Sequence, residues 1–177
     1  MTGDTKALIA DKLLELAKKR GMDKVTVNQI VEECGISRQG FYYYYQDILD
    51  VARQAFTERL KTILDRCADA EAPDQALQTF AEELEWQLPA IALGLNSKFR
   101  AELEAILLAV LKEFIRSVLI ENSQDWGVGM ERRQLDFRVD FLACGIAAYA
   151  TEHCGDKPFD TALFTEQMNA MLEPLRH

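Results

Sequence analysis

TVNQIVEECGISRQGFYYYY, residues 26–45, contains the strongest structural signal in this chain. Its apolar residues recur at the spacing of one helical stripe, and Thr26 followed by Gln29 is typical of a capping box at a helix start. Gly35 is placed for a sharp turn, and Ser37 is placed to cap a second helix. The stretch therefore predicts two short helices joined by a tight turn, as in a helix-turn-helix.

The predicted second helix contributes little to a core, because Phe41 is its clearest inward residue. Its other side chains offer donors and flat rings, and Gly40 permits close approach of the backbone. These are the groups that a recognition helix presents to the major groove of DNA. The alternative is an ordinary helical hairpin whose tyrosines cover a surface. The predicted DNA-binding residues are Thr26, Ser37, Arg38, Gln39, Gly40, Tyr42, Tyr43 and Tyr44.

Two kinds of contact are expected from these residues. Arg38 and Gln39 lie at the start of the predicted recognition helix, where side chains reach base edges; Arg favours guanine and Gln favours adenine. The hydroxyl groups of Thr26, Ser37 and the tyrosines at 42–44 are suited to phosphate oxygens. Loss of a base contact should relax sequence preference, whereas loss of a phosphate contact should weaken binding to every sequence alike.

The same part of the chain resembles the TetR family of bacterial transcriptional regulators. The resemblance implies an all-α homodimer with an N-terminal helix-turn-helix DNA-binding domain, residues 1–46. A helical regulatory and dimerisation domain, residues 47–177, would follow, and a helix from 47 to about 69 would connect the two. The residues that carry the resemblance are Gly21, Val25-Thr26-Val27, Ile30, Gly35-Ile36-Ser37, Gly40-Phe41-Tyr42 and Tyr44-Tyr45.

Two positions depart from the family pattern. The family often has His-Phe where this chain has Tyr44-Tyr45, and it often has a phosphate-binding Lys where this chain has Ile48. Without that Lys, we expect the affinity for DNA to depend less steeply on salt. The run FYYYYQDILDV, residues 41–51, resembles the subset of the family that contains activators of dihydroxyacetone kinase operons.

The distribution of charge permits DNA binding despite a net charge of −9. Up to Tyr45 the chain has seven basic and six acidic residues, whereas the remainder has thirteen basic and twenty-three acidic residues. An acidic body repels DNA except where the N-terminal module docks. The chain has no long apolar run and no signal-peptide pattern, so we expect a cytoplasmic protein without a membrane partner. Its free, reduced thiols would be Cys34, Cys67, Cys144 and Cys154.

Apolar stripes predict the remaining helices. A first helix runs from about Asp4 to Arg20, with Ala10, Leu13, Leu14 and Ala17 facing inward. Pro73 starts a helix that Pro89 is expected to end. A helix is predicted from Phe99 to about Asn122, and because Ala105 to Leu111 is apolar almost all round, this helix should be central. Two further helices follow, one with a stripe through Leu142 and one capped by Asp160.

The last two predicted helices have more apolar surface than one neighbour can cover. Phe137 and Phe141 form a second face beside the stripe through Leu142. Pairing two such hairpins about a two-fold axis gives a four-helix bundle; the alternative is an ordinary intramolecular core. The resemblance to the family favours the homodimer. The predicted interface residues are Leu135, Phe137, Phe141, Leu142, Phe164, Met168, Met171 and Leu172.

The resemblance also implies a small-molecule effector pocket among the middle helices. Residues of these types are more often simple core than ligand wall; the candidate lining set is Phe80, Trp86, Phe99, Phe114, Trp126, Tyr149 and His153. No catalytic, metal or cofactor site is expected, because the chain has no phosphate-binding glycine loop, zinc spacing or nucleophile elbow. An enzyme of unfamiliar type is one alternative. The other is a co-regulator whose helical body binds a protein partner.

Overall fold

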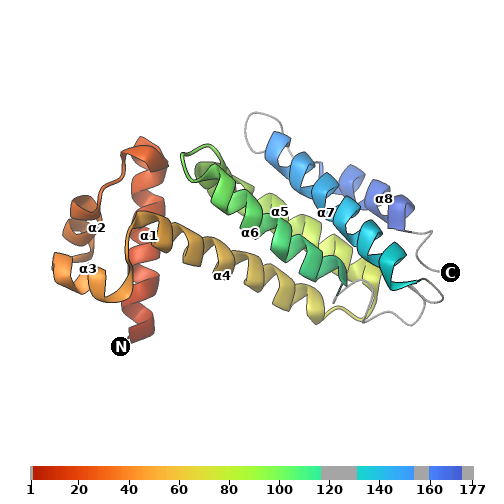
Figure 1. Cartoon of the computed structure of the whole chain (residues 1–177), viewed down its shortest axis with the longest axis horizontal. Coiled ribbons are helices and arrows are strands. Elements are labelled where there is room, and N and C mark those ends of the chain that lie inside the picture. The colour runs from red at the N-terminus through yellow and green to blue at the C-terminus, as the bar shows by residue number, and fades with distance from the viewer. Residues whose placement is uncertain (1, 117–130, 154–159, 173–177) are drawn as a thin grey trace. The chain divides into compact units, whose positions relative to one another are not determined.

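The computed structural model describes residues 2–116, 131–153 and 160–172, and all regular elements in these ranges are helical (Figure 1). The predicted all-α class is confirmed. None of the helices that the structure describes is long and apolar enough to cross a membrane. The elements are α1 (Thr2–Arg20), the 3-10 turn η1 (Met22–Lys24), α2 (Val27–Cys34), α3 (Arg38–Tyr44), α4 (Ile48–Ala68), α5 (Pro73–Leu95), α6 (Arg100–Glu113), α7 (Arg132–His153) and α8 (Thr161–Leu172).

The chain forms two compact units, and each is described by itself. Unit 1 comprises Met1–Glu58 and Ala90–Ile106, and unit 2 comprises Arg59–Pro89 and Leu107–His177. Unit 1 therefore extends beyond the predicted domain of residues 1–46. It also takes in the beginning of α4, the end of α5 and the beginning of α6.

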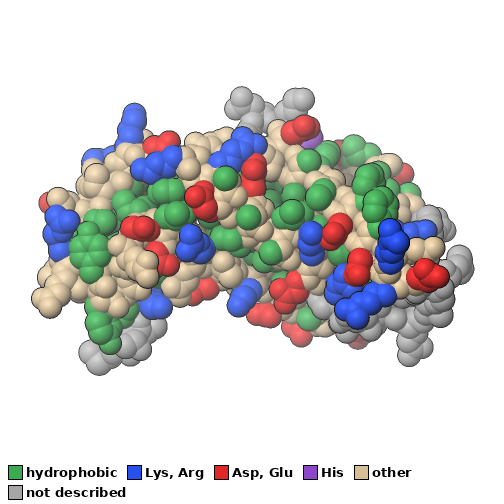
Figure 2. Space-filling view, viewed as in Figure 1, with side chains coloured by type: hydrophobic (Ala, Val, Ile, Leu, Met, Phe, Trp, Pro, Cys, Tyr) green, Lys and Arg blue, Asp and Glu red, His purple; other side chains and the backbone are tan. Residues whose placement is uncertain are grey.

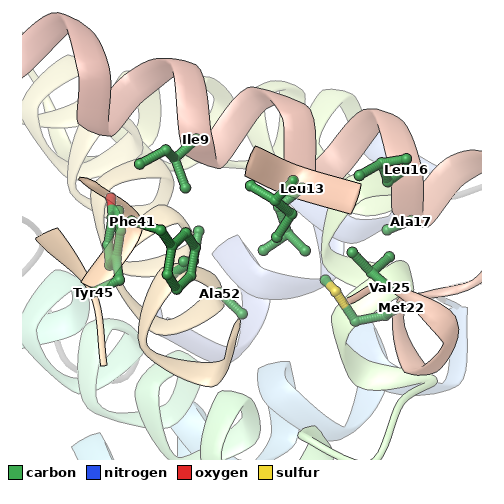
Figure 3. Close-up of a cluster of buried hydrophobic side chains, with 11 residues drawn as sticks. Ile9, Leu13, Leu16, Ala17, Met22, Val25, Phe41, Tyr45 and Ala52 are labelled. Atoms are coloured by element: carbon green, nitrogen blue, oxygen red, sulfur yellow. The ribbon is translucent and has the colours of Figure 1, made fainter. Parts of the chain in front are cut away.

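The core of unit 1 is a cluster of apolar side chains between α1 and the two short helices (Figure 3). Ile30 of α2 and Phe41 of α3 are fully buried in it, as the sequence predicts. On α1 the buried stripe includes Ile9 and Leu16, whereas the predicted inward residue Leu14 is only half-buried. The cluster consists of Ile9, Leu13, Leu16, Ala17, Met22, Val25, Ile30, Phe41, Tyr45, Val51 and Ala52.

Local sequence signals set the ends of α2 and the beginning of α3. The capping box is present: the Gln29 N–H donates to Thr26 Oγ1 at 3.4 Å, and the Thr26 N–H donates to Gln29 Oε1 at 2.9 Å. Gly35 ends α2 in the left-handed region, with φ of 64°, which few other residues adopt without strain. Ser37 then caps α3, since its Oγ accepts from the Gly40 N–H at 3.0 Å. These three predictions are confirmed.

Helix α5 continues past Pro89 to Leu95, so the predicted helix end at Pro89 is wrong. A proline inside a helix removes one backbone hydrogen bond and costs about 3 kcal/mol. The apolar stripe continues beyond it, because Ile91 and Leu95 are each 1% exposed. Burying a side chain of this size contributes about 1.5–3 kcal/mol, so two of them offset the cost of the proline.

The buried apolar side chains of unit 2 lie on α5, α6, α7, α8 and the second half of α4. Phe80 of α5 and Phe114, which directly follows α6, stack with ring centroids 4.3 Å apart, and both are buried. Salt bridges lie outside this core: Lys112 Nζ is 2.9 Å from Asp140 Oδ1, and both side chains are exposed. Exposed pairs of this kind contribute little, so apolar packing holds the unit together. The predicted central helix beyond residue 116 lies outside the described residues.

Candidate nucleic-acid interface

Helix α3 buries one face and exposes the other. Phe41 is 0% exposed and fixes the helix to the cluster of unit 1, whereas Tyr42 and Tyr43 are 49% and 77% exposed. Arg38 and Gln39, in the first turn, are also exposed. The predicted base-reading residues and two of the three tyrosines therefore lie on the solvent face of a helix that is held by one large apolar anchor.

Arg38 and Tyr42 contact each other one turn apart on this face. Arg38 Nη2 donates a hydrogen bond to Tyr42 Oη at 3.4 Å, and the guanidinium carbon lies 5.9 Å from the centroid of the Tyr42 ring. The Tyr42 ring in turn meets the buried Phe41 ring edge to face, at 5.4 Å and 90°. The Arg38 side chain is thus held by a ring that is itself braced on the core.

The other tyrosines differ from Tyr42. Tyr43 meets Tyr44 edge to face, with ring centroids 4.9 Å apart. Tyr44 is half-buried and packs against the core cluster, so less of it is available to a ligand than the sequence suggests. Thr26 and Ser37 are exposed at the beginnings of their helices, and Gly40 is half-buried. Two exposed side chains beside Thr26 were not predicted, those of Lys24 and Asn28.

At the beginning of α4, two carboxylates accept hydrogen bonds from backbone N–H groups. Asp47 Oδ1 accepts from the Asp50 N–H at 2.8 Å, and Asp50 Oδ2 accepts from the Gln46 N–H at 3.0 Å. Ile48, at the position where the family often has a phosphate-binding Lys, is half-buried and packs against the core cluster. Two negative charges and an apolar side chain do not favour a phosphate here, which supports the expected shallow salt dependence.

Tyr45 is a packing residue. It is 3% exposed, and its Oη donates to the Lys6 carbonyl oxygen at 3.4 Å, which ties the segment before α4 to α1. Burial raises the pKa of Tyr45 to about 12, with a smaller contribution from the carboxylates of Glu58 and Asp50. The Lys6 ammonium lies 5.6 Å from the centroid of the Tyr45 ring. This interaction draws Lys6 toward the protein.

The turn between α5 and α6 contacts the helix-turn-helix region within unit 1. The Lys98 N–H donates to Asp23 Oδ1 of η1 at 2.9 Å, across 75 positions of sequence. Phe99 packs against the core cluster of unit 1. Ser97 stiffens the turn, because its Oγ donates to the Gly94 carbonyl oxygen at 2.6 Å and accepts from the Phe99 N–H at 3.1 Å. Phe99, predicted to line an effector pocket, thus lies against the core cluster of unit 1.

The other predicted pocket residues fall at separate places. Phe80 and Phe114 stack on each other inside unit 2, whereas Trp86 is 79% exposed on α5. Tyr149 and His153 stack on α7, with ring centroids 4.0 Å apart. Trp126 lies outside the described residues. Tyr149 also lines a groove between α7 and α8.

A groove of about 370 Å³ lies between α7 and α8. Phe164 and Met168 form its buried floor, whereas Phe141, Leu163 and Met171 are exposed. Phe137 and Phe141 stack on α7, and each is 69% exposed. Of the predicted interface residues, Leu135 is half-buried outside the groove, and the Leu172 side chain lies outside the described residues. The lining residues are Phe141, Leu142, Gly145, Ile146, Tyr149, Leu163, Phe164, Gln167, Met168 and Met171.

A helix-turn-helix with an exposed, polar second helix, followed by a helical body, defines a class of DNA-binding regulators. Residues 9–47 match the family described as bacterial regulatory proteins, tetR family. The N-terminal module therefore belongs to the TetR family, and the whole chain has the fold of TetR-family regulators. No curated protein matches the chain in sequence.

Solved structures share this fold along nearly the whole chain. The dihydroxyacetone kinase operon activator DhaS superposes with a TM-score of 0.77 at 17% identity, over 97% of this chain and 96% of that chain. The fatty acid degradation regulator FadR from Bacillus halodurans gives 0.60 at 18% identity, over 96% and 99%. The TetR family repressor AlkX from Dietzia sp. gives 0.58 at 17% identity, over 96% and 94%. The likeness to DhaS agrees with the subset predicted from residues 41–51.

Proposed function

We propose that this protein is a transcriptional regulator that binds a pseudo-palindromic DNA operator as a homodimer. The observation that carries the proposal is α3, which buries Phe41 completely and exposes Arg38, Gln39, Tyr42 and Tyr43. Arg and Gln at the start of a recognition helix read purine edges in the major groove, and hydroxyl groups bind phosphate oxygens. A two-fold dimer presents the same residues to each half of the site, which is why the operator is pseudo-palindromic.

The groove between α7 and α8 supports the dimer. Phe141 on its rim stacks on the exposed Phe137 ring of the same helix, and water solvates such rings poorly, as on surfaces that bind another protein. A side chain at Gly145 would meet no atom within 4 Å, so there is open space beside this position on the same helix. In an antiparallel two-fold pairing of α7, the Phe141 ring of one copy would face the open space beside Gly145 of its partner.

Modulation of DNA affinity by a small molecule is the second part of the proposal. It is supported by the turn between α5 and α6, which is bonded to η1 through Lys98 and Asp23 and packed on the module through Phe99. A ligand that shifts α5 or α6 therefore acts on the helix-turn-helix. An effector that releases DNA binds the DNA-free form more tightly, and DNA weakens the effector by the same factor. A ligand that binds free and DNA-loaded protein equally would contradict this coupling.

The test of DNA readout is selection of duplexes from a random pool, followed by titration of the wild type and Arg38→Ala. We expect an enriched pseudo-palindrome, because the two copies of α3 are related by symmetry. Arg38→Ala should lower affinity for the selected site by about 1–3 kcal/mol and relax preference at one position per half-site. A pool without an enriched palindrome, or an Arg38→Ala variant with unchanged preference, would overturn the assignment.

A further inference from the structure

Tyr42 differs from its neighbouring tyrosines because it touches the predicted base-reading side chain. Its Oη accepts a hydrogen bond from Arg38 Nη2 at 3.4 Å, and its ring centroid lies 5.9 Å from the Arg38 guanidinium carbon. Residues i and i+4 of a helix lie on one face, so this contact needs no distortion of α3. Contact with the aromatic ring adds a cation–π attraction to the hydrogen bond.

The contact between Arg38 and Tyr42 is supported by the buried Phe41 ring. Phe41 is 0% exposed, and its ring meets Tyr42 edge to face at 5.4 Å. Tyr42 is correspondingly less exposed than Tyr43, at 49% against 77%. A long Arg side chain loses rotamer freedom when it binds a base, and a side chain that is already held loses less. The core of unit 1 thus limits the positions of the Arg38 side chain through the contact of Phe41 with Tyr42 and the contact of Tyr42 with Arg38.

The contact also leaves the Arg38 guanidinium free to read a base. A guanidinium has five N–H donors, of which Tyr42 accepts one. A pair of parallel donors, the pair that matches guanine O6 and N7, is still available. The phenol accepts a hydrogen bond from Nη2 alone, so it can orient Arg38 and still leave donors for the base.

We propose that Tyr42 is a positioning residue for base readout, which sets the direction of the Arg38 guanidinium before DNA binds. This role differs from the phosphate contact predicted from sequence, and it rests on the proposed function. Tyr43 provides the matched comparison, because its ring packs on Tyr44 at 4.9 Å and its hydroxyl lies on the same helix. Removal of the Tyr42 hydroxyl should change the sequence preference of the protein, whereas removal of the Tyr43 hydroxyl should lower its affinity for all DNA sequences.

The experiment compares five proteins: the wild type, Tyr42→Phe, Tyr43→Phe, Arg38→Ala and the double variant Arg38→Ala/Tyr42→Phe. Each is titrated with the selected palindrome and with duplexes in which the base pair read by Arg38 is replaced. The discrimination ratio of Tyr42→Phe should fall by about 2- to 10-fold, the usual effect of one lost hydrogen bond. Tyr43→Phe should keep the wild-type ratio. In the Arg38→Ala background, Tyr42→Phe should leave the ratio unchanged.

The outcomes separate the two proposals. A wild type that selects no site overturns the proposed function and the role of Tyr42 with it. A wild type with clear preference, unchanged by Tyr42→Phe, overturns only the positioning role. If Tyr42→Phe lowers the affinity for every duplex equally, as loss of a phosphate contact would, the positioning role is also overturned. It is overturned likewise if Tyr42→Phe changes the discrimination ratio in the Arg38→Ala background.

Discussion

Helix α3 and the face formed by α7 and α8 both expose large aromatic rings, but the rings differ in chemistry. On α3 the exposed rings are those of Tyr42 and Tyr43, each with a hydroxyl group, beside Arg38 and Gln39. On α7 they are the rings of Phe137 and Phe141, and α8 adds exposed Leu163 and Met171. A ring with a hydroxyl suits the hydrated phosphates and base edges of DNA, whereas a ring without one suits another apolar surface.

The comparison shows that exposure alone does not distinguish the two surfaces. Charged side chains of both signs and apolar side chains are interspersed on the face seen in Figure 2. The polar atoms beside each ring decide what it binds. Arg38 places five N–H donors next to Tyr42, whereas Gln167 and Tyr149 bring the side-chain polar atoms to a groove of α7 and α8 that is otherwise lined by apolar residues. The following predictions test this contrast, from the largest effect to the smallest.

The largest effect is expected where an aromatic ring of α3 points inward. Phe41→Ala removes a fully buried ring and should lower the free energy of unfolding by about 3–5 kcal/mol. Tyr43→Ala, two positions away on the exposed face, should change it by less than about 0.5 kcal/mol. Urea denaturation followed by circular dichroism measures both. Similar losses for the two variants would contradict the division of α3 into a packing face and a binding face.

The next effect concerns association through the apolar face. Phe141→Glu places a charge on the exposed rim of the groove, where folding is little affected but pairing is opposed. It should weaken the dimer by about 2–4 kcal/mol, or about 30- to 1,000-fold. Trp86→Glu is the matched control, because Trp86 is even more exposed but lies on α5. Light scattering over a range of concentrations measures association; dissociation by both variants, or by neither, would contradict the prediction.

Phe141 tests the interface more cleanly than the buried predicted residues do. Met168 is 6% exposed and forms part of the groove floor, so a charge there would unfold the protein as well as oppose pairing. The exposed rim separates the two effects, because its side chains contribute little to the stability of one copy.

A smaller effect distinguishes buried Tyr45 from the exposed tyrosines. Because burial raises the pKa of Tyr45 from 10 to about 12, the folded state holds this proton more tightly than the unfolded chain. The stabilisation is complete below pH 10 and is lost as pH rises from 10 to 12, at about 1.4 kcal/mol per pH unit. Tyr45→Phe should remove this part of the alkaline loss, whereas Tyr43→Phe should not.

The Tyr45 measurement needs one further control. Burial also raises the pKa of the Cys67 thiol of unit 2 to about 12 and raises the pKa of the Cys34 thiol, so the wild type loses stability through these thiols from pH 9 upward, in addition to the Tyr45 effect above pH 10. Urea unfolding at pH 9, 10, 11 and 12 therefore compares wild type, Tyr45→Phe and Cys67→Ala. If Tyr45→Phe followed the wild-type curve throughout, the pKa of Tyr45 would have to lie near its ordinary value.

Local signals in the sequence were sufficient to predict the helix-turn-helix. The capping box at Thr26, the turn at Gly35, the cap at Ser37 and the anchor Phe41 each depend on residues within one or two turns. The helix end predicted at Pro89 from helix propensity is wrong, because burial of side chains further along α5 outweighs the cost of one proline. Interactions between residues that are close in sequence can be predicted from the sequence, whereas stabilisation by packing against distant residues cannot.

The placement of the predicted pocket residues depended on long-range packing. Phe99, in the turn before α6, and Trp86, on α5, are both aromatic residues, yet one packs against the core of unit 1 and the other is 79% exposed. The bond between Asp23 and Lys98 joins positions 75 residues apart, and no local pattern marks either residue as its partner. The same holds for Tyr42, whose contact with Arg38 follows from helical spacing but whose brace on Phe41 becomes visible only in the structure.

The most direct test of the contrast between the two faces is a DNA titration of wild type and Phe141→Glu. Each protein is titrated with the selected palindrome and with a duplex that contains one half-site. The wild type should bind the palindrome at least about 100-fold more tightly than the half-site, because the second α3 is already tethered by its partner. Phe141→Glu should bind both duplexes with the wild type's half-site affinity. Undiminished binding of the palindrome by Phe141→Glu, or loss of its half-site binding, would contradict the separation of DNA reading from dimerisation.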